Sequence, residues 1–158
     1  MSLPWSQWYA SIESVNFPDR YIRHFNFLGR IDVIQAGNNQ DSKDGTFILV
    51  EGLADPRHFS IMSVTASNFF LRHQDWRIKL QRNDASDQFA ADATFQITPP
   101  LAYNRTSAPS GISFRSYNIP ECFIRHSNFE LWLGKAEFTD QYALDASFNV
   151  RKALLPNP

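Results

Sequence analysis

The segment Tyr21-Ile22-Arg23-His24-Phe25-Asn26-Phe27 occurs three times in this chain of 158 residues. Its counterparts are Phe70-Leu71-Arg72-His73-Gln74-Asp75-Trp76 and Phe123-Ile124-Arg125-His126-Ser127-Asn128-Phe129. Three Arg-His pairs therefore occupy matching positions, and such self-similarity at a regular spacing indicates an internal repeat. The repeat divides the chain into thirds.

An aspartate follows each copy of the segment. Asp44, Asp92 and Asp145 come 20, 19 and 19 residues after the corresponding histidines. Each unit of about fifty residues thus supplies one His and one Asp. A unit of that length is too short to bury a good core alone, so the three units must share one core.

Each unit is predicted to form four short strands. The first alternates polar and apolar residues, the second carries the Arg-His pair, the third alternates again, and the fourth is β-branched and aromatic. The expected first strands are 10–15, 59–64 and 112–117, the third 27–31, 76–80 and 129–133, and the fourth 46–50, 94–98 and 147–151. A polar loop is expected before the fourth strand, and no segment gives a convincing helical pattern.

Twelve short strands with a threefold repeat favour a closed barrel, because closure removes exposed sheet edges. The expected fold is an all-β β-trefoil, with three repeats of four strands and pseudo-threefold symmetry. A sandwich does not predict a threefold repeat, and a propeller has at least about four blades. The expected organisation is a leader or linker at 1–8 and a single domain at 9–158, with repeats at about 9–57, 58–108 and 109–155.

Composition and charge narrow the class of partner. Hydrophobic residues make up 43% and charged residues 20%, as in ordinary globular proteins, and a net charge of -1 gives no reason to expect nucleic acid or an anionic membrane. Cys122 is alone, so it forms no internal disulfide and is expected to be an inert core thiol. The start of the chain has no signal-peptide pattern, and no apolar stretch approaches the ~18 residues of a membrane helix.

The repeated His and Asp are the candidate site residues. A carboxylate accepts two vicinal hydroxyls, an imidazole adds a donor or acceptor, and aromatic faces cover the C–H surface of a sugar, so the pattern is typical of neutral-sugar binding. The alternative is structural: a half-buried His and an Asp that caps a turn, which a symmetric fold would repeat as well. As loop-end carboxylates, the aspartates are expected to face solvent and to contribute little to stability.

Neighbouring residues are expected to support the fold. Arg23, Arg72 and Arg125 precede the histidines by one residue, so strand alternation directs them to the opposite face, where they pair with carboxylates or backbone carbonyls. The same alternation assigns three aromatic residues to the core: Tyr21, Phe70 and Phe123.

Metal and catalytic sites are not predicted. One His and one Asp per unit, with no Cys pair and no His-x-His spacing, do not make a zinc site. Glycoside hydrolysis normally needs two opposed carboxylates, and a unit offers one repeated Asp. We therefore expect a binding module without metal, cofactor or catalytic residues.

The segments 14–27 and 116–129, together with Asp92-Ala93-Thr94-Phe95, resemble the arabinose-binding AbfB domain of α-L-arabinofuranosidases, carbohydrate-binding module family 42. The resemblance covers about residues 9–155. It implies a non-catalytic β-trefoil that binds α-L-arabinofuranosyl side chains of arabinoxylan or arabinan and targets an attached glycoside hydrolase to plant cell-wall hemicellulose. The implied pockets, one per unit, are His24 with Asp44, His73 with Asp92, and His126 with Asp145.

The resemblance also implies a monomeric domain within a larger, secreted multidomain enzyme, and hence an extracellular location. Unit one has an extra residue and Gly45 in place of alanine, and unit two lacks the Asn-x-Pro turn, so unit three is expected to follow the family geometry best. Two alternatives stay open. One is a lectin-like trefoil for galactose or another sugar; the other is a protein-interaction trefoil without a sugar pocket, which separated or buried His-Asp pairs would favour.

Overall fold

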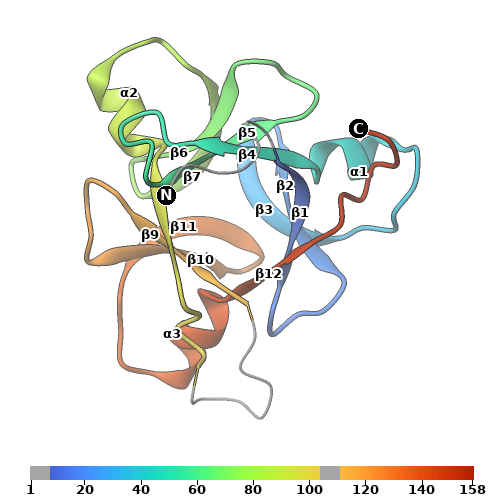
Figure 1. Cartoon of the computed structure of the whole chain (residues 1–158). Coiled ribbons are helices and arrows are strands. Elements are labelled where there is room, and N and C mark those ends of the chain that lie inside the picture. Colours follow the sequence, from blue (N-terminus) through green and yellow to red (C-terminus); the bar gives the residue numbers. More distant parts are fainter. Residues whose placement is uncertain (1–7, 104–110) are drawn as a thin grey trace.

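The computed structural model describes residues 8–103 and 111–158. Within these ranges a 12-stranded sheet is accompanied by three short helices, each at the edge of one lobe (Figure 1). Residues 1–7 of the expected leader lie outside the described residues, while Trp8 already belongs to the first strand.

Each third of the chain has the same order of elements, with three strands, a short helix and a fourth strand. The first third contains β1 (Trp8–Ser14), β2 (Arg20–Phe25), β3 (Leu28–Val33), α1 (Gln40–Asp44) and β4 (Phe47–Glu51). The second contains β5 (Phe59–Ser63), β6 (Phe69–Gln74), β7 (Arg77–Arg82), α2 (Asp87–Asp92) and β8 (Phe95–Thr98). The last contains β9 (Ser113–Ser116), β10 (Cys122–Ser127), β11 (Glu130–Lys135), α3 (Asp140–Asp145) and β12 (Phe148–Arg151).

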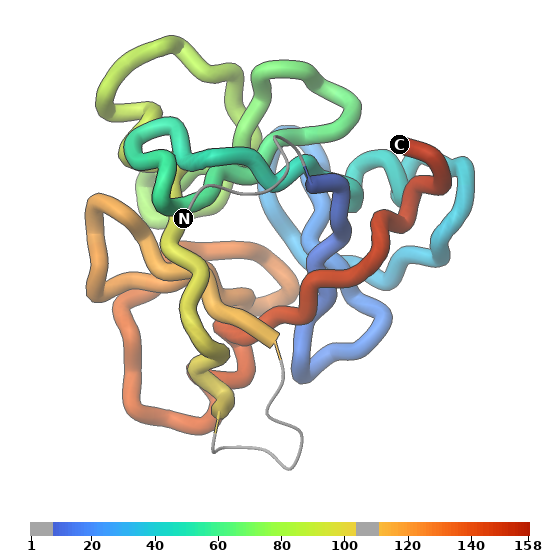
Figure 2. The backbone as a smooth tube through the Cα atoms, viewed as in Figure 1, coloured from blue at the N-terminus to red at the C-terminus, as the bar shows by residue number. Residues whose placement is uncertain are grey.

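The sheet closes on itself, as expected of an all-β barrel. Its path runs from β10 through β9, β8, β5, β4, β1, β2 and β3 to β11, and β11 pairs again with β10. β1 pairs antiparallel with β12, with Ile12 opposite Val150, so the two ends of the described chain run side by side (Figure 2). This pairing joins the first third directly to the last.

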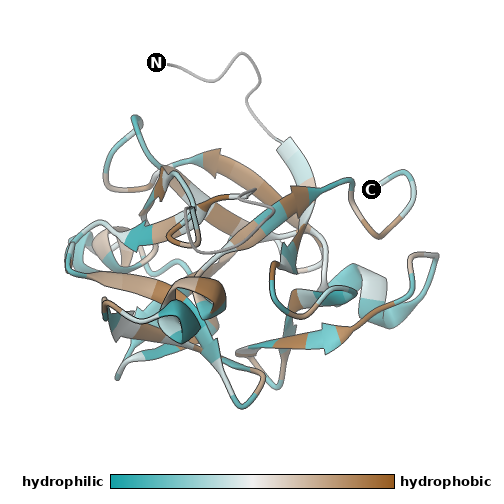
Figure 3. Ribbon diagram, turned by 90° about the horizontal axis from the view of Figure 1, so that it is seen from below, coloured by the Kyte–Doolittle hydropathy of each residue, from teal (hydrophilic) through white to brown (hydrophobic). Residues whose placement is uncertain are grey.

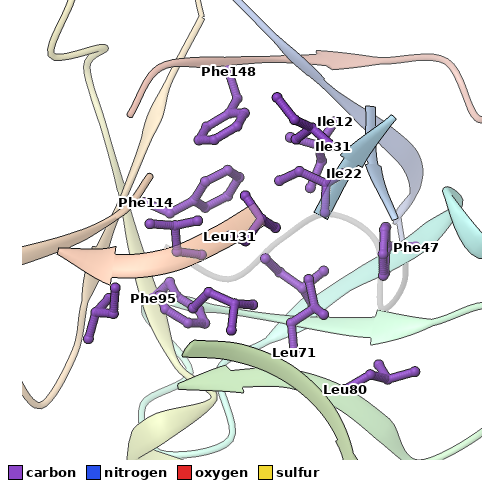
Figure 4. Close-up of a cluster of buried hydrophobic side chains, with 14 of the residues drawn as sticks. Ile12, Ile22, Ile31, Phe47, Leu71, Leu80, Phe95, Phe114, Leu131 and Phe148 are labelled. Atoms are coloured by element: carbon purple, nitrogen blue, oxygen red, sulfur yellow. The ribbon is translucent and has the colours of Figure 1, made fainter. Parts of the chain in front are cut away.

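The core lies inside this barrel and draws on every third. Strand alternation produces it: along β11, Leu131 and Leu133 are buried while Glu130 and Trp132 are only half-buried. Polar and apolar segments therefore alternate along the strands (Figure 3). The cluster includes Ile12, Ile22, Ile31, Phe47, Leu71, Phe95, Phe114, Leu131 and Phe148, whose side chains converge (Figure 4). Cys122 belongs to the same cluster, which confirms its predicted burial.

Three aromatic residues predicted for the core lie elsewhere. Phe70 packs edge-on against Phe89 of α2, with ring centroids 6.4 Å apart. Phe123 forms a second outer cluster with Tyr142 of α3. Tyr21 is only half-buried. Phe70 and Phe123 are thus buried as predicted, but beneath the helices rather than in the barrel.

The hairpins between the second and third strands of each unit hold neighbouring units together. Both central residues of each turn have positive φ, as in type I′ turns, and the second is an aromatic residue where glycine is usual. The backbone carbonyl of each aromatic residue accepts a hydrogen bond from the third strand of another unit. The pairs are Phe27 with Leu80, Trp76 with Leu133, and Phe129 with Ile31. The three hairpins therefore form an interlocked ring.

The three helices contradict the prediction of polar loops. Each begins after a residue whose side chain accepts a backbone N–H three residues on, namely Asn39, Ser86 and Thr139. Helices of five or six residues are too short to show a periodic pattern, which explains the error. Each helix ends at the repeated aspartate, so this residue lies at a helix C-terminus rather than in a loop.

Candidate functional site

The structure brings the six predicted residues together as three pairs. The distance from His Nε2 to Asp Oδ1 is 3.8 Å in pair one (His24 and Asp44), 3.4 Å in pair two (His73 and Asp92) and 3.6 Å in pair three (His126 and Asp145). In each pair the His comes from the second strand and the Asp from the helix of the same unit.

The short helices position the carboxylates. A glutamine four residues before each Asp lies on the same helix face, and its Nε2 donates to Asp Oδ1 at 2.8 to 2.9 Å. A serine of the first strand then fixes the helix end by donating to the backbone carbonyl just after the Asp. The glutamines that bind the carboxylates are Gln40, Gln88 and Gln141. The serines that bind the helix ends are Ser11, Ser60 and Ser113.

The three arginines hold the same carboxylates from the other side. Arg23 donates to Asp44 Oδ2 at 2.7 Å, Arg125 donates to Asp145 Oδ2 at 2.8 Å, and Arg72 makes the equivalent bond to Asp92. The Nε of each arginine also donates to the backbone carbonyl of the next residue, the histidine. The predicted pairing of the arginines with carboxylates and backbone carbonyls is confirmed. The prediction that the arginines lie on the opposite face from the histidines, away from the site, was wrong, because the long arginine side chain reaches around the strand to the aspartate.

In pair two, and likewise in pair three, an asparagine from another unit bridges the His and the Asp. The Asn118 amide donates to Asp92 Oδ1 at 2.8 Å, and its Oδ1 lies 2.8 Å from His73 Nε2. Asn16 makes the same two contacts to pair three, both at 2.9 Å. Because an amide oxygen only accepts, the imidazole Nε2 donates in both. From the sequence these asparagines were predicted only to be turn residues, since nothing local reveals contacts between residues 26 to 129 positions apart.

Among the residues that the structure describes, no asparagine bridges His24 and Asp44 in this way. The position that corresponds to Asn16 and Asn118 is Thr65, whose hydroxyl lies 3.2 Å from Ser63 Oγ. Ser63 Oγ is in turn 3.5 Å from His24 Nε2. Side-chain exposure of His and Asp is 14% and 12% in pair one, 8% and 5% in pair two, and 3% and 7% in pair three. Pair one is therefore the most accessible of the three.

The environment favours the neutral form of His24 and His126 by lowering the pKa of each. Burial lowers the pKa of His24; the Asp44 carboxylate opposes this effect, and the Arg23 guanidinium adds to it. Burial likewise lowers the pKa of His126, against the effect of Asp145. A neutral imidazole can accept with one nitrogen and donate with the other, which suits bonds to hydroxyls or amides.

The burial of the carboxylates overturns the expectation that they face solvent. None of the three aspartates faces solvent, since Asp44, Asp92 and Asp145 are 8%, 4% and 5% exposed. Asp92 and Asp145 each accept three hydrogen bonds. The most accessible pair lies in unit one. Burial of pairs two and three also supports the structural interpretation for them, although each pair is assembled as predicted.

Two larger hollows lie away from the pairs. One, of about 780 Å³, runs between Trp8, Tyr9 and the segment 152–158. The other, of about 500 Å³, is lined by Trp8, Phe59 and Ile112 among others. Neither is lined by a histidine or aspartate of the pairs, so chemistry rather than volume identifies the candidate site.

Other kinds of site find no support in residues 8–103 and 111–158. Within those ranges no group of three or more His, Cys, Asp or Glu residues is arranged to hold a metal ion. The same ranges contain no helix that is long and apolar enough to span a membrane.

Comparison with known proteins identifies the family. Residues 10–150 match the family model of the α-L-arabinofuranosidase B (AbfB) domain. The match covers most of the chain, and its ends fall within the first and last strands of the barrel. The chain belongs to the AbfB family.

Curated relatives are fungal enzymes that are much longer than this chain. An arabinofuranosidase/β-xylosidase of Trichoderma koningii is 28% identical over 131 residues, which is 82% of this chain and 25% of the relative. The α-L-arabinofuranosidase B of Aspergillus niger is 30% identical over 100 residues, or 63% of this chain and 20% of the relative. The chain thus spans about a quarter or less of the length of these relatives.

Solved structures agree on the fold. A GH54 α-L-arabinofuranosidase soaked with a cyclic sulfate inhibitor has a TM-score of 0.83 at 26% identity, covering 95% of this chain and 32% of that one. An arabinofuranosidase complexed with arabinofuranosyl-α-1,2-xylobiose also gives 0.83, at 25% identity and with 98% and 32% coverage. A β-trefoil structure named BEL gives 0.64 at 12% identity, covering 95% and 96%, which shows similarity of fold alone.

Proposed function

We propose that this chain is a non-catalytic carbohydrate-binding module that binds α-L-arabinofuranosyl side chains of arabinoxylan or arabinan. It forms one β-trefoil domain, residues 9–158, with pseudo-threefold repeats of four strands. In its parent protein it brings a glycoside hydrolase of the α-L-arabinofuranosidase type to plant cell-wall hemicellulose outside the cell. The observation that carries the proposal is the accessible His24-Asp44 pair in a member of the AbfB family.

Pair one has the chemistry that a small sugar requires. The described residues supply Asp44 with two donors, Gln40 to Oδ1 and Arg23 to Oδ2, whereas a carboxylate accepts about four. Its remaining lone pairs suit two vicinal sugar hydroxyls, and His24 Nε2 lies within reach of a third polar group.

An exposed aromatic side chain contacts the arginine that holds Asp44. Phe25 is 54% exposed, and the guanidinium carbon of Arg23 lies 5.5 Å from the centroid of its ring. The same guanidinium binds Asp44, so the ring and the carboxylate contact one arginine, and the exposed ring offers an apolar face to the C–H surface of a sugar. The corresponding residues of the other units are Gln74 and Ser127, which lack such a face. This difference also favours pair one.

Titration calorimetry with an α-L-arabinofuranosyl-substituted xylo-oligosaccharide, and with the same oligosaccharide after debranching, tests the proposal. The substituted ligand is expected to bind and the debranched one not. Asp44→Ala removes charge-assisted bonds worth roughly 1.5–3 kcal/mol each, so it should weaken binding at least tenfold, while the exposed Glu51→Ala is the matched control. Equal binding of both ligands, or of galactosides in parallel, refutes arabinofuranose recognition.

The absence of catalysis is tested separately. The chain is incubated with arabinoxylan, and free arabinose is measured against a boiled control. We expect no release above the control, because hydrolysis needs an acid and an opposed nucleophile or base around the scissile bond. Release by the native chain alone refutes the assignment as a binding module.

A further inference from the structure

The three His-Asp pairs differ in whether an asparagine of another unit occupies them. In each of pairs two and three, a single asparagine amide hydrogen-bonds both the carboxylate and the imidazole, at 2.8 to 2.9 Å. An amide presents two adjacent polar groups to the pair, as a vicinal diol would present two hydroxyls. The asparagine thus takes the hydrogen bonds that a sugar would otherwise make.

Each asparagine is itself held in place. Ser116 Oγ donates to Asn118 Oδ1 at 3.1 Å, and Ser14 Oγ donates to Asn16 Oδ1 at 3.0 Å. The same serines accept the backbone N–H of the following turn, from Ile119 and Phe17. The amide is therefore preorganised by its own turn, so displacing it breaks contacts with both units.

Aromatic packing closes pair three further. The Phe17 ring meets the His126 ring edge-on, with centroids 5.5 Å apart, and Phe148 lies on another side at 6.5 Å. In pair one the ring of Phe47, a core residue, meets the His24 ring edge-on, with centroids 6.3 Å apart. The turn residue that corresponds to Phe17 in unit two is Ala66, which offers no ring to cover His24.

We propose that Asn16 and Asn118 act as internal latches, which fasten adjacent units and keep pairs three and two from binding sugar, so that the chain has one binding site, pair one. Thr65 is the residue that leaves this site open, because its side chain carries a hydroxyl in place of the bridging amide. The statement about sugar rests on the proposed function, whereas the statement about fastening does not.

Binding stoichiometry tests the first part. The whole chain is titrated with a xylo-oligosaccharide that carries one arabinofuranosyl group, and we expect one site per chain. Thr65→Asn, and the double variant Thr65→Asn/Ser67→Pro that restores the turn of unit one, should weaken binding at least tenfold; Asn38→Thr, an exposed asparagine, is the control. Asn118→Thr should add a second, weaker site. Two or three sites in the parent, or unchanged affinity in both Thr65 variants, overturns the proposal.

Thermal melts without ligand test the second part. Loss of the amide leaves a buried carboxylate and a buried imidazole each short of a partner, so Asn16→Thr and Asn118→Thr should lower Tm by about 3–10 °C relative to Asn38→Thr. Failure of the parent to bind any arabinofuranosyl ligand would refute the proposed function, and these melts would still decide on the latches. Tm values within a degree of the control overturn the fastening role.

Discussion

Asp145→Ala is expected to destabilise the fold by about 3 kcal/mol. The carboxylate accepts hydrogen bonds from Arg125, Gln141 and Asn16, at 2.8, 2.8 and 2.9 Å. Removing one partner of a buried ion pair costs roughly 3–5 kcal/mol, and the lower end applies because the Arg125 side chain is 20% exposed and water partly compensates. At roughly 2–4 °C per kcal/mol for a chain of this size, Tm should fall by about 6–12 °C.

The equivalent change in pair one should cost less. Arg23, which binds Asp44, also donates to Asp41 at 3.1 Å and lies 3.7 Å from Asp32. Its charge therefore keeps carboxylate partners after Asp44→Ala, and we expect a loss of about 1–2 kcal/mol. The ranking of the two variants depends on the network rather than on the residue type.

Circular dichroism melts and urea titrations at pH 7 measure both variants beside Glu51→Ala, whose side chain is exposed. Asp145→Asn separates charge from shape, because it keeps one acceptor oxygen and removes the charge opposite Arg125. Two results would refute the reasoning. One is a Tm for Asp145→Ala within a degree of the parent; the other is a Tm for Asp44→Ala below that of Asp145→Ala. Either would show that the buried network contributes little to stability.

Three further predictions follow from burial. Burial lowers the folded-state pKa of His24 and His126 below the ordinary value near 6.5, so the unfolded chain binds protons first as the pH falls. The free energy of unfolding should therefore be highest above about pH 6.5 and decline toward pH 5, and His126→Gln should flatten this decline in urea titrations. A free energy of unfolding of the parent that rises toward pH 5 would contradict this prediction. Phe114→Ala should cost about 3–5 kcal/mol in the same assay, since the ring is fully buried in the shared core; a cost below 1 kcal/mol would place the core elsewhere. The Cys122 thiol, which is 2% exposed and whose pKa is raised by burial, should react with a thiol reagent only on unfolding, and rapid reaction of the native chain would refute its burial.

The features that local sequence could predict are those with a short period. Alternation located the strands, and the regular spacing of His and Asp identified three pairs that the structure assembles within 3.4 to 3.8 Å. A helix of one and a half turns shows no such period, although Asn39, Ser86 and Thr139 are typical helix N-caps. Attention to those caps would have placed the aspartates at helix ends.

Long-range contacts were beyond the sequence patterns. Asn16 reaches Asp145 across 129 residues, and alternation predicts the direction of a Cβ atom rather than the endpoint of an arginine. One signal was available: asparagine recurs at positions 16 and 118, whereas the matching position of unit two is Thr65. A symmetric structural role would have been filled in all three units, so this difference indicates that one pair serves another purpose.

The latches also explain how thirds that cannot fold alone become one cooperative unit. β1 pairs with β12, Arg151 donates to Glu13 at 2.8 Å, and Asn16 joins pair three, so the first third is fastened to the last by backbone, charge and amide together. Asn118 fastens the last third to the second. Every junction also has a continuous β ladder, with four residue pairs in β1–β12 and in β8–β9 and five in β4–β5, which joins the first and second thirds. The β4–β5 ladder thus joins the first and second thirds although no amide among the described residues bridges them, which supports our proposal that pair one is the pair that binds a sugar.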